Sequence, residues 1–328
     1  MKITFLFREY NAHQISIEKL FSYIIPALEN KGVVADTITN PYPFSFLSVF
    51  KAMLFFKKNQ GEINHITGDI HWACLFLPAD KTVLTVHDLV GLQQLSGLKK
   101  WIYYFLWVYL PIKKLKYITV ISQKTKDEIT SIIPSAAKKI TVIENCLTIP
   151  VTTQVVKQFP ARPTVLIVGT RSNKNIERIL QAAVGLPVDL RIIGELSSQE
   201  IEFLRDNEIR YTNYSEVSDD FLVDSYKQSH ILCFPSLYEG FGLPIIEAQA
   251  QNCIVITSNR SPMNDVAGEA AVVVDPENVN EIRNAIVKII DNKELQHNLM
   301  TAGRENVKKF LPSQIAQQYI DLYKKMKN

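Results

Sequence analysis

Two parallel α/β domains of the Rossmann-like kind are predicted, and two observations on the sequence predict them. Short runs rich in β-branched and aromatic residues recur along both halves of the chain, separated by stretches with helical spacing of apolar residues. This alternation is typical of parallel sheets covered by helices. At 328 residues and 47% hydrophobic composition, the chain is also long enough to bury two cores.

The first half of the chain is predicted to form one sheet. Between its first two strand-like runs, residues 17–28 carry apolar side chains at helical spacing, and we expect this helix to cover one face of the sheet. The strand-like runs comprise residues 3–7, 33–37, 63–67, 82–86, 117–121 and 140–143.

A linker is predicted at residues 148–163, where the apolar periodicity ends and three prolines gather. A second series of strand-like runs follows it, at residues 164–169, 190–194, 231–235, 254–257 and 271–274. We therefore expect an amino-terminal domain over residues 1–155 and a second domain over residues 156–311. The amphipathic segment 312–328 is expected to be a separate terminal helix.

The loop after the run 231–235 has the features of an anion site. Gly240 and Gly242 allow backbone N–H groups to approach a ligand, and a helix that Pro244 can start adds partial positive charge. Glu239 and Glu247 bracket this loop, and carboxylates accept hydrogen bonds from hydroxyls rather than binding phosphate. The pattern indicates a phosphate that carries a sugar or ribose.

Two cations are expected near that loop. Arg171 and Lys174 lie in the segment GTRSNKN, directly after the first strand of the second domain. Ligands of open α/β sheets bind at the carboxyl ends of strands, so a cation in this loop would face the ligand.

The segment EGFGLPIIE resembles the signature of the retaining glycosyltransferases of family four, which have the GT-B fold of two Rossmann-like domains facing a cleft. The resemblance implies that the first glutamate and the loop amides hold the donor sugar and diphosphate, that the second glutamate holds the ribose, and that the basic pair neutralises the diphosphate. It places donor binding on Gly169, Arg171, Lys174, Glu239, Gly240, Phe241, Gly242, Leu243 and Glu247. It also implies that segment 312–328 crosses back to the amino-terminal domain.

Two departures from the family pattern stand out. Many members have the arginine directly after the glycine, where this chain has Thr170, so Arg171 stands one position later than the family pattern. The family often has a glycine-rich loop after its first strand, where this chain reads REYNAHQIS, and no role is assigned to Arg8 or His13.

His87 and Asp88 follow the strand 82–86 and resemble a His-Asp pair of the family, in which the histidine reaches the donor sugar. A histidine satisfied by local hydrogen bonds is the alternative. The expected catalytic residues are His87, Lys174 and Glu239. At the end of the preceding strand, an acceptor side could include Thr67, Gly68, Asp69 or His71, and no motif selects among them.

The charge distribution is uneven. Residues 1–160 carry 18 basic and 11 acidic residues, whereas residues 161–328 carry 18 and 22. Much of the basic excess flanks the aromatic segments 44–58 and 99–116, which are either core helices or contacts with an anionic membrane surface. The amino terminus lacks a long apolar run, so we expect a cytoplasmic protein, peripheral at the inner face of the membrane if these segments bind lipid.

No metal or other cofactor is expected. The four cysteines are scattered without a Cys-x-x-Cys pair, which indicates neither a zinc site nor a disulfide framework. Metal-dependent glycosyltransferases usually carry an Asp-x-Asp pair, and this chain has none.

The sequence predicts a retaining, metal-independent glycosyltransferase, a hexosyltransferase-like enzyme of surface polysaccharide or glycolipid biosynthesis. Its expected partners are a nucleoside diphosphate sugar, a glycan or lipid-linked acceptor with a free hydroxyl, and no nucleic acid. The alternatives are another GT-B enzyme, such as a nucleotide-sugar epimerase or a phosphorylase, and a non-catalytic nucleotide-sugar binding protein. A Rossmann dehydrogenase is disfavoured because neither domain opens with G-x-G-x-x-G.

Overall fold

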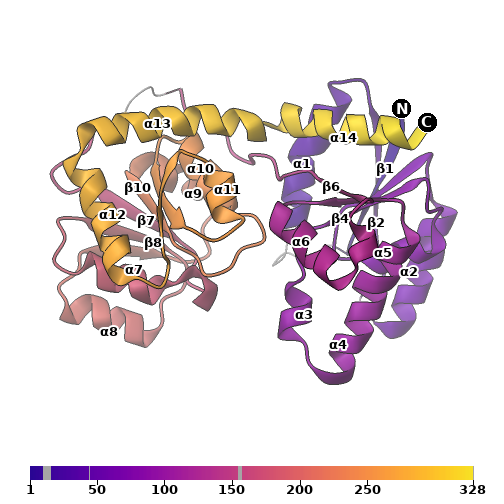
Figure 1. The fold of residues 1–328 in the computed structure, drawn as a ribbon, viewed down its shortest axis with the longest axis horizontal. Helices are drawn as coiled ribbons and strands as arrows, with labels where there is room; N and C mark the ends of the chain where they lie inside the picture. Colours follow the sequence, from indigo (N-terminus) through magenta and orange to yellow (C-terminus); the bar gives the residue numbers. More distant parts are fainter. Residues whose placement is uncertain (10–15, 44, 154–156, 328) are drawn as a thin grey trace. The chain divides into compact units, whose positions relative to one another are not determined.

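The computed structural model describes residues 1–9, 16–43, 45–153 and 157–327. The chain divides into two compact units, one coloured indigo to magenta together with the yellow terminal helix, and the other coloured pink through orange to gold (Figure 1). Unit 1 comprises Met1–Thr148 and Leu311–Asn328, and unit 2 comprises Ile149–Phe310. The boundary after Thr148 lies seven residues before the predicted boundary at residue 155. The chain returns to unit 1 at Leu311, one residue before the predicted start of the terminal segment at residue 312.

Unit 1 contains a six-stranded sheet of order β2-β1-β3-β4-β5-β6, in which every paired strand is parallel. The strand order reverses between β1 and β3, because β2 lies on one side of β1 and all later strands lie on the other. The strands are β1 (Lys2–Phe7), β2 (Val34–Thr39), β3 (Ile63–Ile66), β4 (Thr82–Val86), β5 (Tyr117–Val120) and β6 (Ile140–Val142).

Helices cover both faces of this sheet. Alternate side chains of β1, Ile3 and Phe5, pack against α1 (Ser16–Glu29) and α14 (Pro312–Lys327), whereas Leu6 faces the opposite core. That second core contains α2 (Phe46–Lys58), η1 (His71–Phe76) and α5 (Leu110–Lys114). The remaining helical elements are α3 (Val90–Gln94), α4 (Gly97–Tyr103), the π-helical η2 (Tyr104–Tyr109), α6 (Gln123–Ile132) and η3 (Pro134–Ala136).

The terminal helix α14 is held to the sheet of unit 1 by buried hydrogen bonds as well as apolar contacts. The Tyr323 hydroxyl lies 2.6 Å from His65 Nδ1, and His65 Nε2 lies 2.7 Å from the Thr85 hydroxyl. Burial lowers the pKa of His65 to about 3, so the ring is neutral here. Satisfied polar groups in a core fix one register of packing.

Unit 2 has a second six-stranded parallel sheet, of order β12-β11-β10-β7-β8-β9, and its order reverses between β7 and β10. Five of these strands agree with the sequence prediction, but β9 was missed. Its sequence, YTNY, is largely exposed at the edge of the sheet and lacks an apolar run. The strands are β7 (Thr164–Val168), β8 (Asp189–Ile193), β9 (Tyr211–Tyr214), β10 (Ile231–Phe234), β11 (Ile254–Ser258) and β12 (Ala271–Val274).

In unit 2, α7 (Ile176–Ala183) packs beside α12 (Val279–Asp291) on one face of the sheet, and α9 (Asp219–Gln228) and α10 (Leu243–Ala250) lie on the other (Figure 1). The two sheets and their helices confirm the prediction of two Rossmann-like domains. The remaining helical elements are η4 (Ser172–Lys174), α8 (Ser198–Asp206), α11 (Met263–Ala267), α13 (Lys293–Val307) and η5 (Lys308–Phe310).

Local capping explains where several of these helices begin. The Ser122 side chain accepts a hydrogen bond from the Thr125 N–H at the start of α6, and Asn278 accepts from the N–H groups of Asn280 and Glu281 at the start of α12. Within the described ranges, no helix combines the length and apolar character needed to cross a membrane.

Candidate functional site

The candidate site lies where the strand order of unit 2 reverses. Loops after β7 and β10 leave the sheet at the same edge there and continue in opposite directions, which opens a crevice in sheets of this topology. The first loop carries Arg171 and Lys174, and the second carries Glu239. These residues are far apart in sequence, and the topology alone brings them together.

An ion pair joins the two loops. Lys174 Nζ lies 2.7 Å from Glu239 Oε1, and both side chains keep some exposure, 19% and 14%. The ammonium also stands 4.6 Å from the centre of the Phe234 ring, a cation–π distance. Asn173 adds a second link, because its Nδ2 donates to the Tyr238 carbonyl oxygen at 3.0 Å. The pair is therefore preorganised yet open to a ligand.

The backbone of the first loop is shaped around the lysine. Gly169 has φ +86°, and a Cβ at this position would stand 3.0 Å from Lys174 Cε, so only glycine combines this conformation with the close approach. A pocket of about 710 Å³ opens beside it, lined by Gly169, Thr170, Arg171, Lys174, Gly194, Glu195, Leu196 and Ser197. Arg171 is exposed and makes no ion pair with a described carboxylate.

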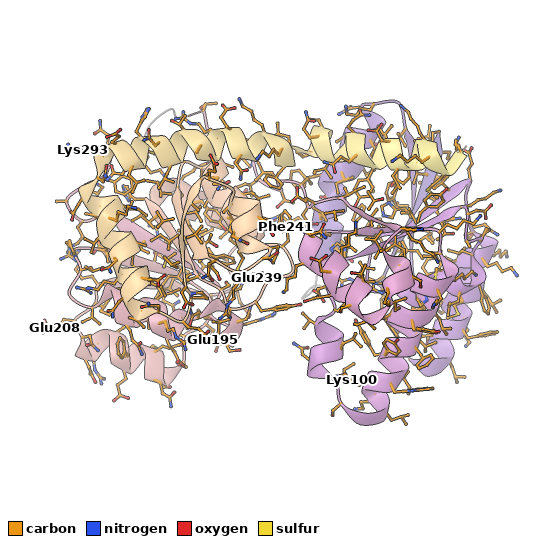
Figure 2. All side chains as sticks on the ribbon, viewed as in Figure 1. Lys100, Glu195, Glu208, Glu239, Phe241 and Lys293 are labelled. Carbon is orange, nitrogen blue, oxygen red and sulfur yellow. The ribbon has the colours of Figure 1, made fainter. Side chains whose placement is uncertain are left out.

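The second loop leads directly into a helix. Gly242, with φ +107°, is the N-cap of α10, and Leu243 and Pro244 are its first residues. Figure 2 labels Phe241 close to Glu239. The Phe241 side chain is buried against Phe310, with ring centres 6.0 Å apart, so any ligand contact from Phe241 falls on its backbone. The first N–H groups of a helix have no partner within the helix and favour an anion.

Glu247 lies on α10 in a different environment from Glu239. It is only 5% exposed, and the Tyr226 hydroxyl of α9 donates to its Oε2 at 3.0 Å. Burial, followed by the Glu247 charge, raises the pKa of Tyr226 well above its ordinary value, so the hydroxyl keeps its proton and remains a donor. The tyrosine thus orients the carboxylate.

His87 belongs to unit 1, at the carboxyl end of β4. Its Nε2 donates to the Thr67 carbonyl oxygen at 2.7 Å, which fixes the proton on Nε2 and leaves the Nδ1 lone pair as an acceptor when the ring is neutral. Burial lowers the pKa of His87, favouring that neutral form. Gly68 packs against the ring so closely that a Cβ would lie 2.7 Å from His87 Cδ2.

Comparison with known proteins shows that this arrangement is similar to a known family. Residues 152–306 match the family of glycosyl transferases group 1. We refer to this segment as the group 1 domain, after the family that it matches. It includes both loops of the ion pair and the whole of α10.

Curated relatives of the group 1 domain include two O-antigen enzymes. The chain is 32% identical to O-antigen chain mannosyltransferase B of Escherichia coli over 48% of this chain and 45% of that protein. It is 25% identical to O-antigen chain mannosyltransferase RfbU of Salmonella typhimurium, over 63% of this chain and 60% of that protein. The chain thus spans about half the length of the curated relatives it matches.

Solved structures share the fold over nearly the whole chain. Sucrose-phosphate synthase from Thermosynechococcus elongatus covers 99% of both chains with a TM-score of 0.74 at 19% identity. The lipopolysaccharide outer core galactosyltransferase WaaB covers 99% of this chain and 100% of that one, with a TM-score of 0.72 at 18% identity. The fold is GT-B, as the resemblance implied.

The residues of the group 1 domain that sequence reasoning missed are Asn173 and Tyr226. Asn173 stands inside the GTRSNKN segment and could have been suspected from its position. Tyr226 gave no signal, because an aromatic residue on an amphipathic helix ordinarily indicates core packing. Only the fold shows that its hydroxyl meets Glu247.

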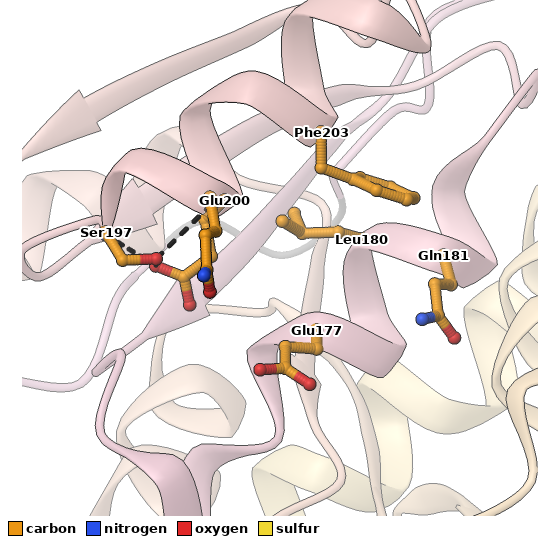
Figure 3. Close-up of a pocket in the computed structure, with 7 residues that line it drawn as sticks. Glu177, Leu180, Gln181, Ser197, Glu200 and Phe203 are labelled. Atoms are coloured by element: carbon orange, nitrogen blue, oxygen red, sulfur yellow. Dashed lines mark hydrogen bonds between the residues drawn. The ribbon is translucent and has the colours of Figure 1, made fainter.

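A second pocket of about 200 Å³ adjoins the first at Ser197, between α7 and α8 (Figure 3). The Ser197 and Glu200 side chains bond to each other in the capping box that starts α8, and Glu177 also lines this pocket. Two carboxylates make it unfavourable for phosphate, in contrast to the pocket beside Lys174. No group of three or more potential metal-ligating acids, histidines or cysteines occurs among the described residues.

Proposed function

We propose that this protein is a retaining glycosyltransferase that moves a sugar from a nucleoside diphosphate donor to a hydroxyl acceptor in surface polysaccharide or glycolipid biosynthesis. The group 1 domain and the relatives named as O-antigen mannosyltransferases support this activity. Mannose is the first donor sugar to test, because several of those relatives are named for mannosyl transfer.

The Lys174–Glu239 ion pair at the strand-order reversal of unit 2 is the observation that carries the proposal. In the assignment we propose, the diphosphate occupies the positively charged part of the site, which Lys174, Arg171 and the start of α10 form. Glu239 then accepts hydrogen bonds from hydroxyls of the transferred sugar. Glu247, held by Tyr226, accepts hydrogen bonds from the ribose.

Catalysis in this proposal rests on electrostatics and positioning. As the glycosidic bond breaks, negative charge grows on the departing diphosphate, and preorganised cations stabilise that charge without reorganising. Lys174 is preorganised, since Glu239 and the Phe234 ring hold it before any ligand arrives. Neutral His87 offers an acceptor nitrogen to the sugar, and the protein cations take the part that a metal has in other transferases.

In this proposal a further partner is an anionic membrane, which binds the surface of unit 1. Apolar side chains of α2 and α4 face solvent: Leu47 is 76% exposed, Phe50 56%, Leu98 72% and Trp101 58%. Exposed lysines flank them, Lys51 and Lys58 on α2 and Lys99 and Lys100 on α4. Exposed apolar residues flanked by lysines favour shallow contact with anionic headgroups.

Ligand-dependent thermal stabilisation tests the donor assignment directly. Purified protein is heated with nucleoside diphosphate mannose, other nucleoside diphosphate sugars, free nucleoside diphosphates and matched monophosphates. At 100 times its dissociation constant a ligand adds about 2.7 kcal/mol to the free energy of unfolding. Stabilisation by at least one diphosphate sugar, with acceptor-dependent nucleotide release, is the expected result. Stabilisation by none contradicts the proposal, and binding without release at any acceptor indicates a binding protein.

A further inference from the structure

A second group of charged and polar side chains lies where the strand order of unit 1 reverses. Arg8 follows β1, Asp69 follows β3, and His87 and Asp88 follow β4, all at the carboxyl edge of the sheet. The reversal falls between β1 and β3, so Arg8 and Asp69 stand at the topological position where open α/β sheets bind ligands. Lys174 and Glu239 hold the same position in unit 2.

A guanidinium joins the loops here, as an ammonium does in unit 2. Arg8 Nη1 makes a close ion pair with Asp69 Oδ2, and Arg8 Nε lies 2.9 Å from Glu18 Oε1. The Arg8 side chain is 12% exposed and the Asp69 side chain 55%. Since Asp69 remains largely open to solvent, its carboxylate can accept hydrogen bonds from a ligand while keeping its pair with Arg8.

The backbone of Asp69 is held in an uncommon conformation. Its φ is +52°, in the left-handed region that side-chain-bearing residues rarely adopt. Trp107 Nε1 donates to the Asp69 carbonyl oxygen at 2.5 Å, and Tyr103 stacks on Trp107 with ring centres 5.5 Å apart. Strained residues that their surroundings hold in place cluster at functional sites. Trp107 is therefore a positioning residue for Asp69.

Charge decides what class of ligand fits this edge. Arg8 pairs with Glu18 and Asp69, and the charges of Arg8, Asp69 and Asp88 all act on the neighbouring His87 ring, so three carboxylates and one guanidinium gather at this edge. This excess repels phosphate, unlike the cationic loop of unit 2. Carboxylates and a guanidinium together suit vicinal hydroxyls, which both donate and accept hydrogen bonds.

We infer that the Arg8–Asp69 pair of unit 1 is a binding site for a neutral hydroxylated ligand, with Asp69 as the residue that receives its hydroxyls. The inference rests on the proposed function, in which that ligand is the acceptor sugar. It narrows the acceptor: the part bound at Asp69 is an uncharged saccharide, and any phosphate of a lipid-linked acceptor lies away from this pair.

Saccharide binding to the full-length chain tests the inference. The probes are mannose-, galactose-, glucose-, rhamnose- and N-acetylglucosamine-terminated neutral oligosaccharides and their terminally phosphorylated counterparts, each read by saturation-transfer NMR and calorimetry. Asp69→Asn keeps the size and tolerates the left-handed backbone, because asparagine adopts it readily. Asp36→Asn is the matched control, since Asp36 is also an ion-paired carboxylate of unit 1, 48% exposed, bonded to Lys2 at 2.7 Å.

Wild-type protein is expected to bind at least one neutral probe more tightly than its phosphorylated counterpart. Asp69→Asn should weaken that binding about tenfold, the scale of a hydrogen bond to a charged group, and Asp36→Asn should change it less than twofold. No neutral binding, a preference for phosphorylated probes, or equal affinity in wild type and Asp69→Asn each overturns the inference. Nucleotide affinity, measured in the same samples, reports separately on the proposed donor site of unit 2.

Discussion

Glu239 and Glu247 stand eight positions apart in sequence and serve different purposes because their partners differ. Glu239 is paired with a cation at the opening of a pocket, whereas Glu247 is buried and fixed by a tyrosine hydroxyl. A carboxylate beside a cation can meet the transferred sugar without repelling the diphosphate. A buried, oriented carboxylate suits one defined pair of ribose hydroxyls.

Replacing each glutamate by glutamine, which preserves size, should affect nucleotide affinity in one variant and turnover in the other. Glu247→Gln is expected to weaken binding of a free nucleoside diphosphate about tenfold, because it removes a charged acceptor from the ribose. Glu239→Gln should leave that affinity within about twofold while lowering turnover. Calorimetry with free nucleotide and steady-state rates check both. Equal losses of nucleotide affinity would contradict the assignment.

Tyr226 gives a second prediction at this scale. Tyr226→Phe removes only the hydroxyl that orients Glu247, so nucleotide affinity should fall about threefold to tenfold, less than in Glu247→Gln. Combining both changes should add little to Glu247→Gln, since they act on one hydrogen bond. Tyr211→Phe, at an exposed tyrosine of β9, is the control. Additive losses in the double variant would show that Tyr226 acts independently of Glu247.

At the scale of elements, the aromatic segments 44–58 and 99–116 differ in how far their helices are buried, and the sequence could not show this difference. Helix α2 buries Ala52, Met53 and Phe56 while exposing Leu47 and Phe50, so it is a core helix with an apolar outer face. Helix α4 has no fully buried residue: Trp101 is exposed, and Tyr103 is only partly buried where it packs against the core of unit 1. Periodicity locates an amphipathic helix but does not show which apolar side chains lack a partner.

Vesicle sedimentation tests the membrane contact. The protein should pellet with anionic vesicles and be released by salt, because salt screens the lysines. Lys51, Lys58, Lys99 and Lys100 replaced together by Gln should lower pelleting severalfold. Lys114 is spared because its ammonium donates to the Leu75 carbonyl oxygen. Lys288→Gln with Lys293→Gln, two exposed lysines of unit 2, is the control. Unchanged pelleting of the four-lysine variant would refute the contact.

Most elements were predictable because local patterns determine them. Capping by Ser122 and Asn278 and the apolar spacing of α1 follow from neighbouring residues. Strand β9 was not predictable, since an edge strand with exposed polar residues has no apolar run. The bond between Tyr323 of α14 and His65, and the bond from His65 to Thr85, also lie beyond local sequence, because they join positions that only the fold brings together.

At the scale of the whole molecule, buried histidines should make stability sensitive to acid. Burial lowers the pKa of His65 to about 3 and of His230 to about 4, and lowers those of His71 and His87. The unfolded chain binds protons at these rings below about pH 6.5, whereas the folded chain does not. Unfolding is therefore favoured as pH falls, by about 1.4 kcal/mol per pH unit for His65 alone.

Urea unfolding at pH 7, 6 and 5 checks this sign. The midpoint should fall with each step, and His65→Gln should show a shallower dependence on pH. A midpoint that is constant from pH 7 to 5 would mean that the rings are not held neutral in the folded chain.

The candidate site could be predicted from sequence only in part. The Glu239 loop and the Lys174 loop each carry a local pattern, and the resemblance assigned them a shared ligand. Their pairing at 2.7 Å depends on the strand order of unit 2, which no local pattern determines. For the same reason Asp69 stood among several equal candidates until the reversal between β1 and β3 and its contact with Arg8 selected it.

The central claim is that protein cations at the reversal of unit 2 stabilise the departing diphosphate. Steady-state transfer rates with a nucleoside diphosphate sugar, with and without EDTA, test it in wild type and Lys174→Ala. Lys227→Ala is the control, because Lys227 is also ion-paired, 3.1 Å from Asp224, but its side chain lies on the exposed face of α9.

Wild-type turnover is expected to survive EDTA, and Lys174→Ala should lower turnover on the order of 10²–10³-fold, the scale for removing one preorganised group from a transition state. Lys227→Ala should stay near wild type. The opposite pattern, in which EDTA abolishes turnover, Mg²⁺ or Mn²⁺ restores it and Lys174→Ala is nearly normal, would contradict the account.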